Sequence, residues 1–101
     1  MMAITIGPQT TPRRHPDAAF RIYDGEAFVV LPHSHAYKIL NQVGSRVWDL
    51  IDGSKSVGAI ADVIAEEYDV SRDTALKDVN DFVGELEANG MLAPRDAGKV
   101  A

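Results

Sequence analysis

The chain has 101 residues, of which 46% are hydrophobic and 25% are charged, and its formal net charge at pH 7 is −5. This length predicts one domain with an apolar core of its own, and the negative charge argues against a protein that binds nucleic acid directly. The absence of cysteine excludes disulfides, thiolate zinc sites and thiol catalysis.

Both ends of the chain are expected to be flexible. Residues 1–17 contain three prolines and several threonines and predict an N-terminal arm, while residues 94–101 predict a tail. The domain then spans residues 18–93. The arm lacks the apolar region of a secretory signal, and no run in the sequence approaches the roughly 18 apolar residues of a membrane span. We therefore expect a cytoplasmic protein with no membrane partner.

Three short strands are predicted at the start of this domain. Two β-prone runs, at residues 18–23 and 26–31, flank Asp24-Gly25. This pair is typical of a two-residue type I′ turn, because both central positions need a positive φ. A third strand is predicted at residues 35–40, after a turn that contains proline. The three strands form an antiparallel meander, and its third strand lies at an edge if the second is central.

Two short helices follow the strands. Asn41 can accept a backbone N–H and cap the first helix, which ends at Asp52-Gly53. The apolar stripe of this helix consists of Val43, Val47, Leu50 and Ile51. Ser56 caps the second helix, which ends near Asp69. Its buried stripe is expected to consist of Val57, Ile60, Ala61, Ile64 and Tyr68.

A third helix is predicted from its N-cap Ser71 to about Asn89, and Gly90 stops it. One stripe faces the core and consists of Ala75, Val79, Phe82 and Leu86. A second row beside it consists of Leu76, Asn80, Val83 and Glu87. This row either widens the core face or lines a groove beside the sheet. Gly84 favours the groove, because a mid-helix glycine costs about 1 kcal/mol relative to alanine and a close backbone approach would justify it.

An edge strand beside an apolar helix row suits the binding of an extended peptide. The free edge offers unpaired N–H and C=O groups, so a peptide can add there as a further strand. Backbone hydrogen bonds then give affinity and side-chain pockets give specificity. Lys38 and Lys77 would steer an acidic peptide towards this site, although ordinary solvation of the two side chains is the simpler interpretation.

Catalytic and metal-binding patterns are weak in this sequence. His33-Ser34-His35 has the residue types of a metal site or a nucleophile with its base, but no carboxylate cluster or orienting acid lies nearby in sequence. No Walker loop, dinucleotide-binding motif or HExxH motif is present. We therefore expect a non-catalytic protein without a metal or cofactor.

A winged-helix DNA-binding regulator is the alternative function. A sheet followed by three helices, the last two joined by a short turn, resembles a winged helix-turn-helix, whose last helix often reads DNA. From Val57 to Leu92, however, nine acidic residues stand against two basic ones, a net charge of −7. Phosphates would be repelled by this surface. A third hypothesis is a module that only organises an enzyme complex and binds the enzyme without any peptide.

Three motifs in order resemble the pyrroloquinoline quinone synthesis protein D (PqqD-like) family. They are LN-x-x-G-x-x-x-W-x-L-I-DG from Leu40, S-V-x-x-I-A-x-x-I-A-x-x-YDVS from Ser56, and D-V-x-x-F-V-x-E-L-x-x-x-GML from Asp78. The similarity runs from about Phe28 to Leu92. It implies an α+β fold, in which a three-stranded antiparallel sheet is followed by a three-helix bundle, and this agrees with the elements predicted above.

The resemblance also implies a function. Members of this family are recognition elements for ribosomally made and modified peptides (RiPP recognition elements), and they act as peptide chaperones. They bind the leader of the precursor peptide and present its core to a modifying enzyme, which in the quinone pathway is a radical S-adenosylmethionine (radical SAM) protein. The leader adds beside the third strand and packs on the third helix. The peptide-binding residues expected here are Ala36, Tyr37, Lys38, Ile39, Leu40, Leu76, Lys77, Asn80, Val83, Gly84 and Glu87.

One departure from the family pattern limits the expectation. Members in the quinone pathway often have cysteine before the Asp-Gly pair, whereas Ile51 stands there in this chain. Leader binding is therefore expected more firmly than a role in pyrroloquinoline quinone biosynthesis. The exposed strand edge is compatible with either a monomer or a strand-exchanged dimer.

Overall fold

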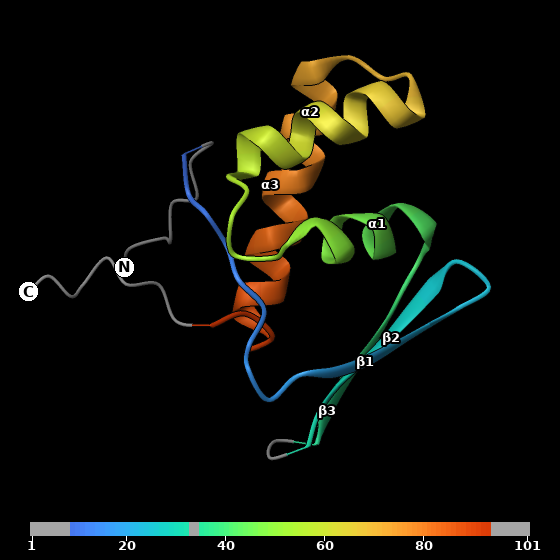
Figure 1. The fold of residues 1–101 in the computed structure, drawn as a ribbon, viewed down its shortest axis with the longest axis vertical. Coiled ribbons are helices and arrows are strands. Elements are labelled where there is room, and N and C mark those ends of the chain that lie inside the picture. The colour runs from blue at the N-terminus through green and yellow to red at the C-terminus, as the bar shows by residue number, and fades with distance from the viewer. Residues whose placement is uncertain (1–8, 33–34, 94–101) are drawn as a thin grey trace, which may run out of the picture.

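The computed structural model describes residues 9–32 and 35–93, and it has the predicted α+β fold (Figure 1). The strands are β1 (Ala19–Tyr23), β2 (Glu26–Leu31) and β3 (Ala36–Leu40). The helices are α1 (Gln42–Leu50), α2 (Val57–Tyr68) and α3 (Arg72–Ala88). Helix α1 lies next to the sheet, and α2 and α3 pack against each other farther from it.

The sheet is an antiparallel meander in the order β1-β2-β3, as predicted. Asp24 and Gly25 connect the first two strands with φ values of 57° and 82°, so both central positions of the hairpin turn have the positive φ that was expected. Strand β3 begins one residue later than predicted, because His35 has a φ of 59° and belongs to the preceding turn. Since β2 is central, the outer edge of β3 pairs with no strand of the described residues.

One face of the sheet forms the core together with the helices. Ala27 and Val29 of β2 are fully buried, as is Trp48 of α1. The hydroxyl of Ser45 on α1 accepts a hydrogen bond from the N–H of Ala27 (2.6 Å) and donates one to the carbonyl of Leu40 (3.2 Å). This buried hydroxyl therefore links the first helix to two strands at the corner where β3 turns into α1.

The three predicted helix N-caps are confirmed. Asn41, Ser56 and Ser71 each accept a backbone N–H from three residues later, at 2.8, 3.1 and 3.1 Å. The end of α1 differs from the prediction. Ile51 is the C-cap, and Gly53, whose φ is 86°, lies two residues beyond it, in the loop before α2.

That loop is organised by the carboxylate of Asp52. It accepts hydrogen bonds from the hydroxyl and the backbone N–H of Ser54, at 2.7 and 2.9 Å, and from Nζ of Lys55 at 3.0 Å. These hydrogen bonds, those of Ser54 above all, hold the pKa of the Asp52 carboxyl well below its ordinary value. Asp52 and Gly53, which were expected to end α1, therefore shape the loop just after it.

Residues 9–17 form an extended strap that is bound to the domain, which differs from the expected flexible arm. The carbonyl of Thr10 accepts the N–H of Val57 (2.8 Å), and the carbonyl of Arg13 accepts the N–H of Ala93 (2.8 Å). The N–H of His15 also donates to the carbonyl of Met91, at 3.1 Å. The rest of the predicted arm, residues 1–8, and the predicted tail, residues 94–101, lie outside the described residues.

Across the two described ranges, no helix has the length and apolarity needed to cross a membrane.

Candidate functional site

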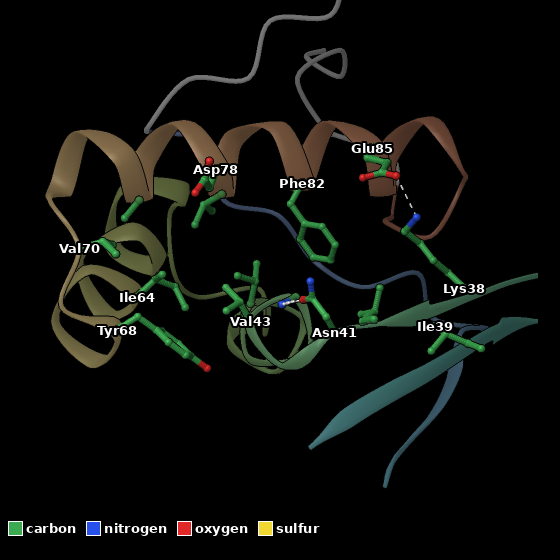
Figure 2. A pocket seen from close by; sticks show the side chains of 15 residues that line it. Lys38, Ile39, Asn41, Val43, Ile64, Tyr68, Val70, Asp78, Phe82 and Glu85 are labelled. Atoms are coloured by element: carbon green, nitrogen blue, oxygen red, sulfur yellow. Dashed lines mark hydrogen bonds and ion pairs between the residues drawn. The ribbon is translucent and has the colours of Figure 1, made fainter. Parts of the chain in front are cut away.

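A cavity of about 480 Å³ opens between β3, the start of α1, the turn from α2 to α3, and α3 itself (Figure 2). Strand β3 contributes Lys38, Ile39 and Leu40. Helix α1 and its cap contribute Asn41, Val43, Gly44 and Val47. The corner of α2 and α3 contributes Ile64, Tyr68 and Val70. Helix α3 contributes Ala75, Asp78, Val79, Phe82 and Glu85.

The wall of this cavity is apolar where helices α1 and α3 approach each other. The ring of Phe82 projects from α3 towards the start of α1 (Figure 2). A Cβ on Gly44 would lie 3.3 Å from two atoms of this ring and 3.1 Å from Oδ1 of Asn41. Gly44 therefore allows the Phe82 ring and the Asn41 amide to lie close against the first turn of α1.

Charged groups stand at the rim of the cavity. Nζ of Lys38 lies 2.9 Å from Oε2 of Glu85, so an ion pair connects β3 to α3 at one end. Nζ of Lys77 lies 3.1 Å from Oδ2 of Asp81, and this hydrogen bond raises the pKa of Lys77. Both lysines that were expected to steer an acidic peptide therefore have carboxylate partners. Asp78 adds a further carboxylate to the lining. The cavity therefore carries no excess of positive charge that would attract an acidic peptide.

The edge of β3 and the cavity are continuous. Tyr37 and Ile39 are 65% and 64% exposed, while Leu40 on the opposite face is buried. Lys38, Ile39 and Leu40 line the cavity, so an extended segment placed along the free edge would also meet the cavity wall. This arrangement can accept backbone hydrogen bonds and apolar side chains from the same ligand.

Comparison with known proteins places the chain in a family. The family model of coenzyme PQQ synthesis protein D (PqqD) matches residues 26–92. The chain belongs to the PqqD family. No curated protein matches it.

Solved structures resemble this PqqD-family chain over most of its length. TbiB1 in complex with the TbiA(beta) leader peptide is 29% identical, with a TM-score of 0.76, and the match covers 82% of this chain and 96% of that one. A lasso peptide synthetase B1 complexed with its leader peptide is 25% identical, with a TM-score of 0.75, and the coverage is 84% and 100%. The PqqD truncation of Methylobacterium extorquens PqqCD shares the fold at 18% identity, with a TM-score of 0.75 and coverage of 89% and 96%.

The residues predicted on the third helix of this PqqD-family chain lie outside the cavity. They are Leu76, Lys77, Asn80, Val83, Gly84 and Glu87. Val83 is only 1% exposed, because its side chain belongs to the core and widens the buried face of α3. The expectation that Val83 lines a groove is therefore wrong. The peptide contacts of the other five residues stay a prediction, while the cavity faces the neighbouring row of Asp78, Phe82 and Glu85.

Three exposed apolar residues of the cavity were not recognised in the sequence as parts of a site. Val43 and Tyr68, which were expected in the core, are 39% and 38% exposed, and Val70 is 40% exposed. Val43 lies in the first turn of α1 and Tyr68 in the last turn of α2, where each helix runs past the edge of the core. Helical spacing identifies the stripe to which such a residue belongs, but not whether a neighbouring element covers it.

The described residues offer no metal-binding cluster of three or more His, Asp or Glu side chains. Two members of the His-Ser-His segment, His33 and Ser34, lie outside the described residues. The candidate binding surface of this PqqD-family chain is the β3 edge with its adjoining cavity.

Proposed function

We propose that this chain is a non-catalytic peptide chaperone, which binds the leader of a ribosomally made precursor peptide and presents the peptide to a modifying enzyme. The observation that carries the proposal is the open edge of β3 beside a largely apolar cavity of about 480 Å³. Two structures with 29% and 25% identity to this chain are complexes with leader peptides, which supports the same kind of ligand here.

The leader in this proposal adds as a strand beside Ala36–Leu40. Its backbone pairs with the free N–H and C=O groups of β3, and alternate side chains enter the cavity towards Val79 and Phe82 of α3. This binding mode retains the predicted strand and shifts the predicted helix contacts by one row, since the cavity is lined by the row that contains Asp78, Phe82 and Glu85.

The partner enzyme and the setting belong to the same proposal. Membership of the PqqD family supports a radical SAM protein as the modifying enzyme, in pyrroloquinoline quinone biosynthesis or in another pathway for modified peptides. The chain would act in the cytoplasm, as a monomer or as a strand-exchanged dimer. A DNA-binding regulator is not favoured, because the nine acidic and two basic residues between Val57 and Leu92 would repel phosphates.

An amide NMR titration with the short precursor peptide encoded nearest to this protein tests the proposal. Leader binding should shift the resonances of Ala36–Leu40 and of the cavity side of α3, from Asp78 to Glu85. The resonances of β1, which lies at the opposite edge of the sheet, serve as the internal control and should stay in place. Saturating peptide that leaves β3 and α3 unshifted would contradict the proposal.

A further inference from the structure

The side chain of Asn41 has one occupied end and one open end. Its Oδ1 accepts the N–H of Gly44 at 2.8 Å, which caps α1. Because only the carbonyl end of the amide can accept this N–H, the capping bond also fixes the direction of the Nδ2 group. Figure 2 shows this nitrogen on the side of the amide that faces Phe82 and the cavity. Within the described part of the chain, no partner is recorded for the two N–H donors of Nδ2.

Asn41 also stands where the strand ladder stops. It directly follows Leu40, the last residue of β3, and its backbone is still extended, with φ −73° and ψ −177°. Its own carbonyl already accepts the N–H of Ser45 at 2.7 Å as part of α1. A peptide strand that runs along β3 therefore meets the side-chain amide of Asn41 at this point, because the main chain there has already turned into α1.

We propose that Nδ2 of Asn41 donates a hydrogen bond to a main-chain carbonyl of the bound leader at the end of β3, and that this bond holds the end of the added strand in place. The inference rests on the proposed function and adds a residue that positions the leader. The donor extends the hydrogen-bonded ladder by one bond beyond Leu40, where the main-chain carbonyl of Asn41 is already used by α1. Every peptide residue carries a carbonyl, so this contact works independently of the leader sequence.

Asn41→Asp separates the two roles of this side chain. Aspartate and asparagine are equally good N-caps, and an oxygen of the introduced carboxylate would still accept the N–H of Gly44. The carboxylate has no N–H to donate at neutral pH. Asn41→Ser tests the amide without adding a charge, since serine also caps well but replaces the NH₂ group with a shorter hydroxyl. Ser56→Asp is the matched control, because it exchanges the cap of α2, which lies outside the cavity lining.

The leader half of the nearest encoded precursor peptide is the probe, and binding is followed by calorimetry. We expect all three variants to keep the thermal unfolding midpoint of the wild type within a few degrees. Asn41→Asp should weaken binding about tenfold or more and Asn41→Ser about fivefold, because a peptide carbonyl loses its donor. Ser56→Asp should bind like the wild type. In the wild type, the side-chain NH₂ resonance of Asn41 should move on titration with the peptide.

The outcomes distinguish the two proposals. Equal affinities of the wild type and both Asn41 variants, with an unmoved Asn41 NH₂ resonance, would overturn the positioning role of Asn41 and leave leader binding intact. The NH₂ resonance decides the matter even if a variant folds poorly, because it is measured on the wild-type chain. Failure of the wild type to bind the probe would overturn leader binding, and with it the positioning role of Asn41.

Discussion

Val43 and Val83 have the same side chain in opposite environments. Val83 is 1% exposed and packs in the core on α3, whereas Val43 is 39% exposed and lines the cavity on α1. A change at Val83 therefore acts on the free energy of unfolding, while the same change at Val43 acts on the surface that a ligand would cover.

Replacing each valine with glutamate should have opposite effects. Val83→Glu should destabilise the domain by on the order of 4 kcal/mol, because a carboxyl group would be buried without a partner. Val43→Glu should change the stability by about 0.5 kcal/mol or less, but it should weaken leader binding roughly tenfold, because the carboxylate must be desolvated under the peptide. Urea denaturation and calorimetry measure the two effects.

Gln42→Glu is the matched control for this pair. It adds the same charge one residue away, at an exposed position that does not line the cavity. If Val43→Glu binds the leader as tightly as Gln42→Glu does, the peptide does not use the α1 side of the cavity.

At the scale of helices and strands, the features that could be predicted from the sequence are those fixed by residues close together in the chain. The Asp24-Gly25 turn and the caps at Asn41, Ser56 and Ser71 depend on neighbours in the sequence, so their residue types were sufficient to predict them. The face that α3 turns to the cavity depends on how the helix rotates against α1 and the sheet. A pattern of spacing leaves that rotation open, which is why Val83 was expected in a groove.

A pair of arginine–carboxylate hydrogen bonds joins α1 to α2. Nε and one terminal nitrogen of Arg46 donate to the two oxygens of Glu67, at 2.9 and 2.7 Å. The hydrogen bond from Arg46 lowers the pKa of Glu67, and the same bond raises the pKa of Arg46. Since the native state holds this carboxyl ionised, the pair contributes to stability above the ordinary pKa of glutamate, which is about 4.3. The contribution disappears as the pH falls through the lowered native pKa.

Glu67→Gln should therefore be less stable than the wild type at pH 7, and the two proteins should converge in acid. Urea denaturation at a series of pH values measures this difference. Glu66→Gln is the control, because no ion pair is recorded for Glu66 in the described ranges, and its difference from the wild type should not follow this profile. A difference at Glu67 that stays constant down to strongly acid pH would contradict the assignment.

At the scale of the whole molecule, the strap of residues 9–17 holds distant parts of the chain together. Its carbonyls and N–H groups bond to Val57 at the start of α2 and to Met91 and Ala93 after α3. The guanidinium of Arg14 lies 4.9 Å from the ring centroid of Phe20 on β1. Backbone bonds to residues far away in the sequence have no side-chain signature, so proline and threonine content indicated only an arm.

A chain that starts at Ala18 should be less stable than the full chain by about 2–4 kcal/mol, since it loses the backbone hydrogen bonds of the strap and the contacts of Arg14 with the Phe20 and Trp48 rings. Thermal and urea unfolding measure the loss. Arg14→Ala in the full chain removes only the contacts with these two rings and should cost about 0.5–1 kcal/mol. Equal stability of the truncated and full chains would show that the strap is not bound in solution.

Trp48, the single tryptophan of the chain, is fully buried and lies outside the cavity lining. Its indole meets the ring of Phe20 edge-on, at 5.6 Å between centroids, and the guanidinium of Arg14 in the strap lies 5.8 Å from the centroid of the tryptophan ring. Its intrinsic fluorescence is thus a natural reporter of folding and strap attachment. The same emission should not respond to a ligand in the cavity, so a leader without tryptophan needs a label of its own to be followed by optical titration.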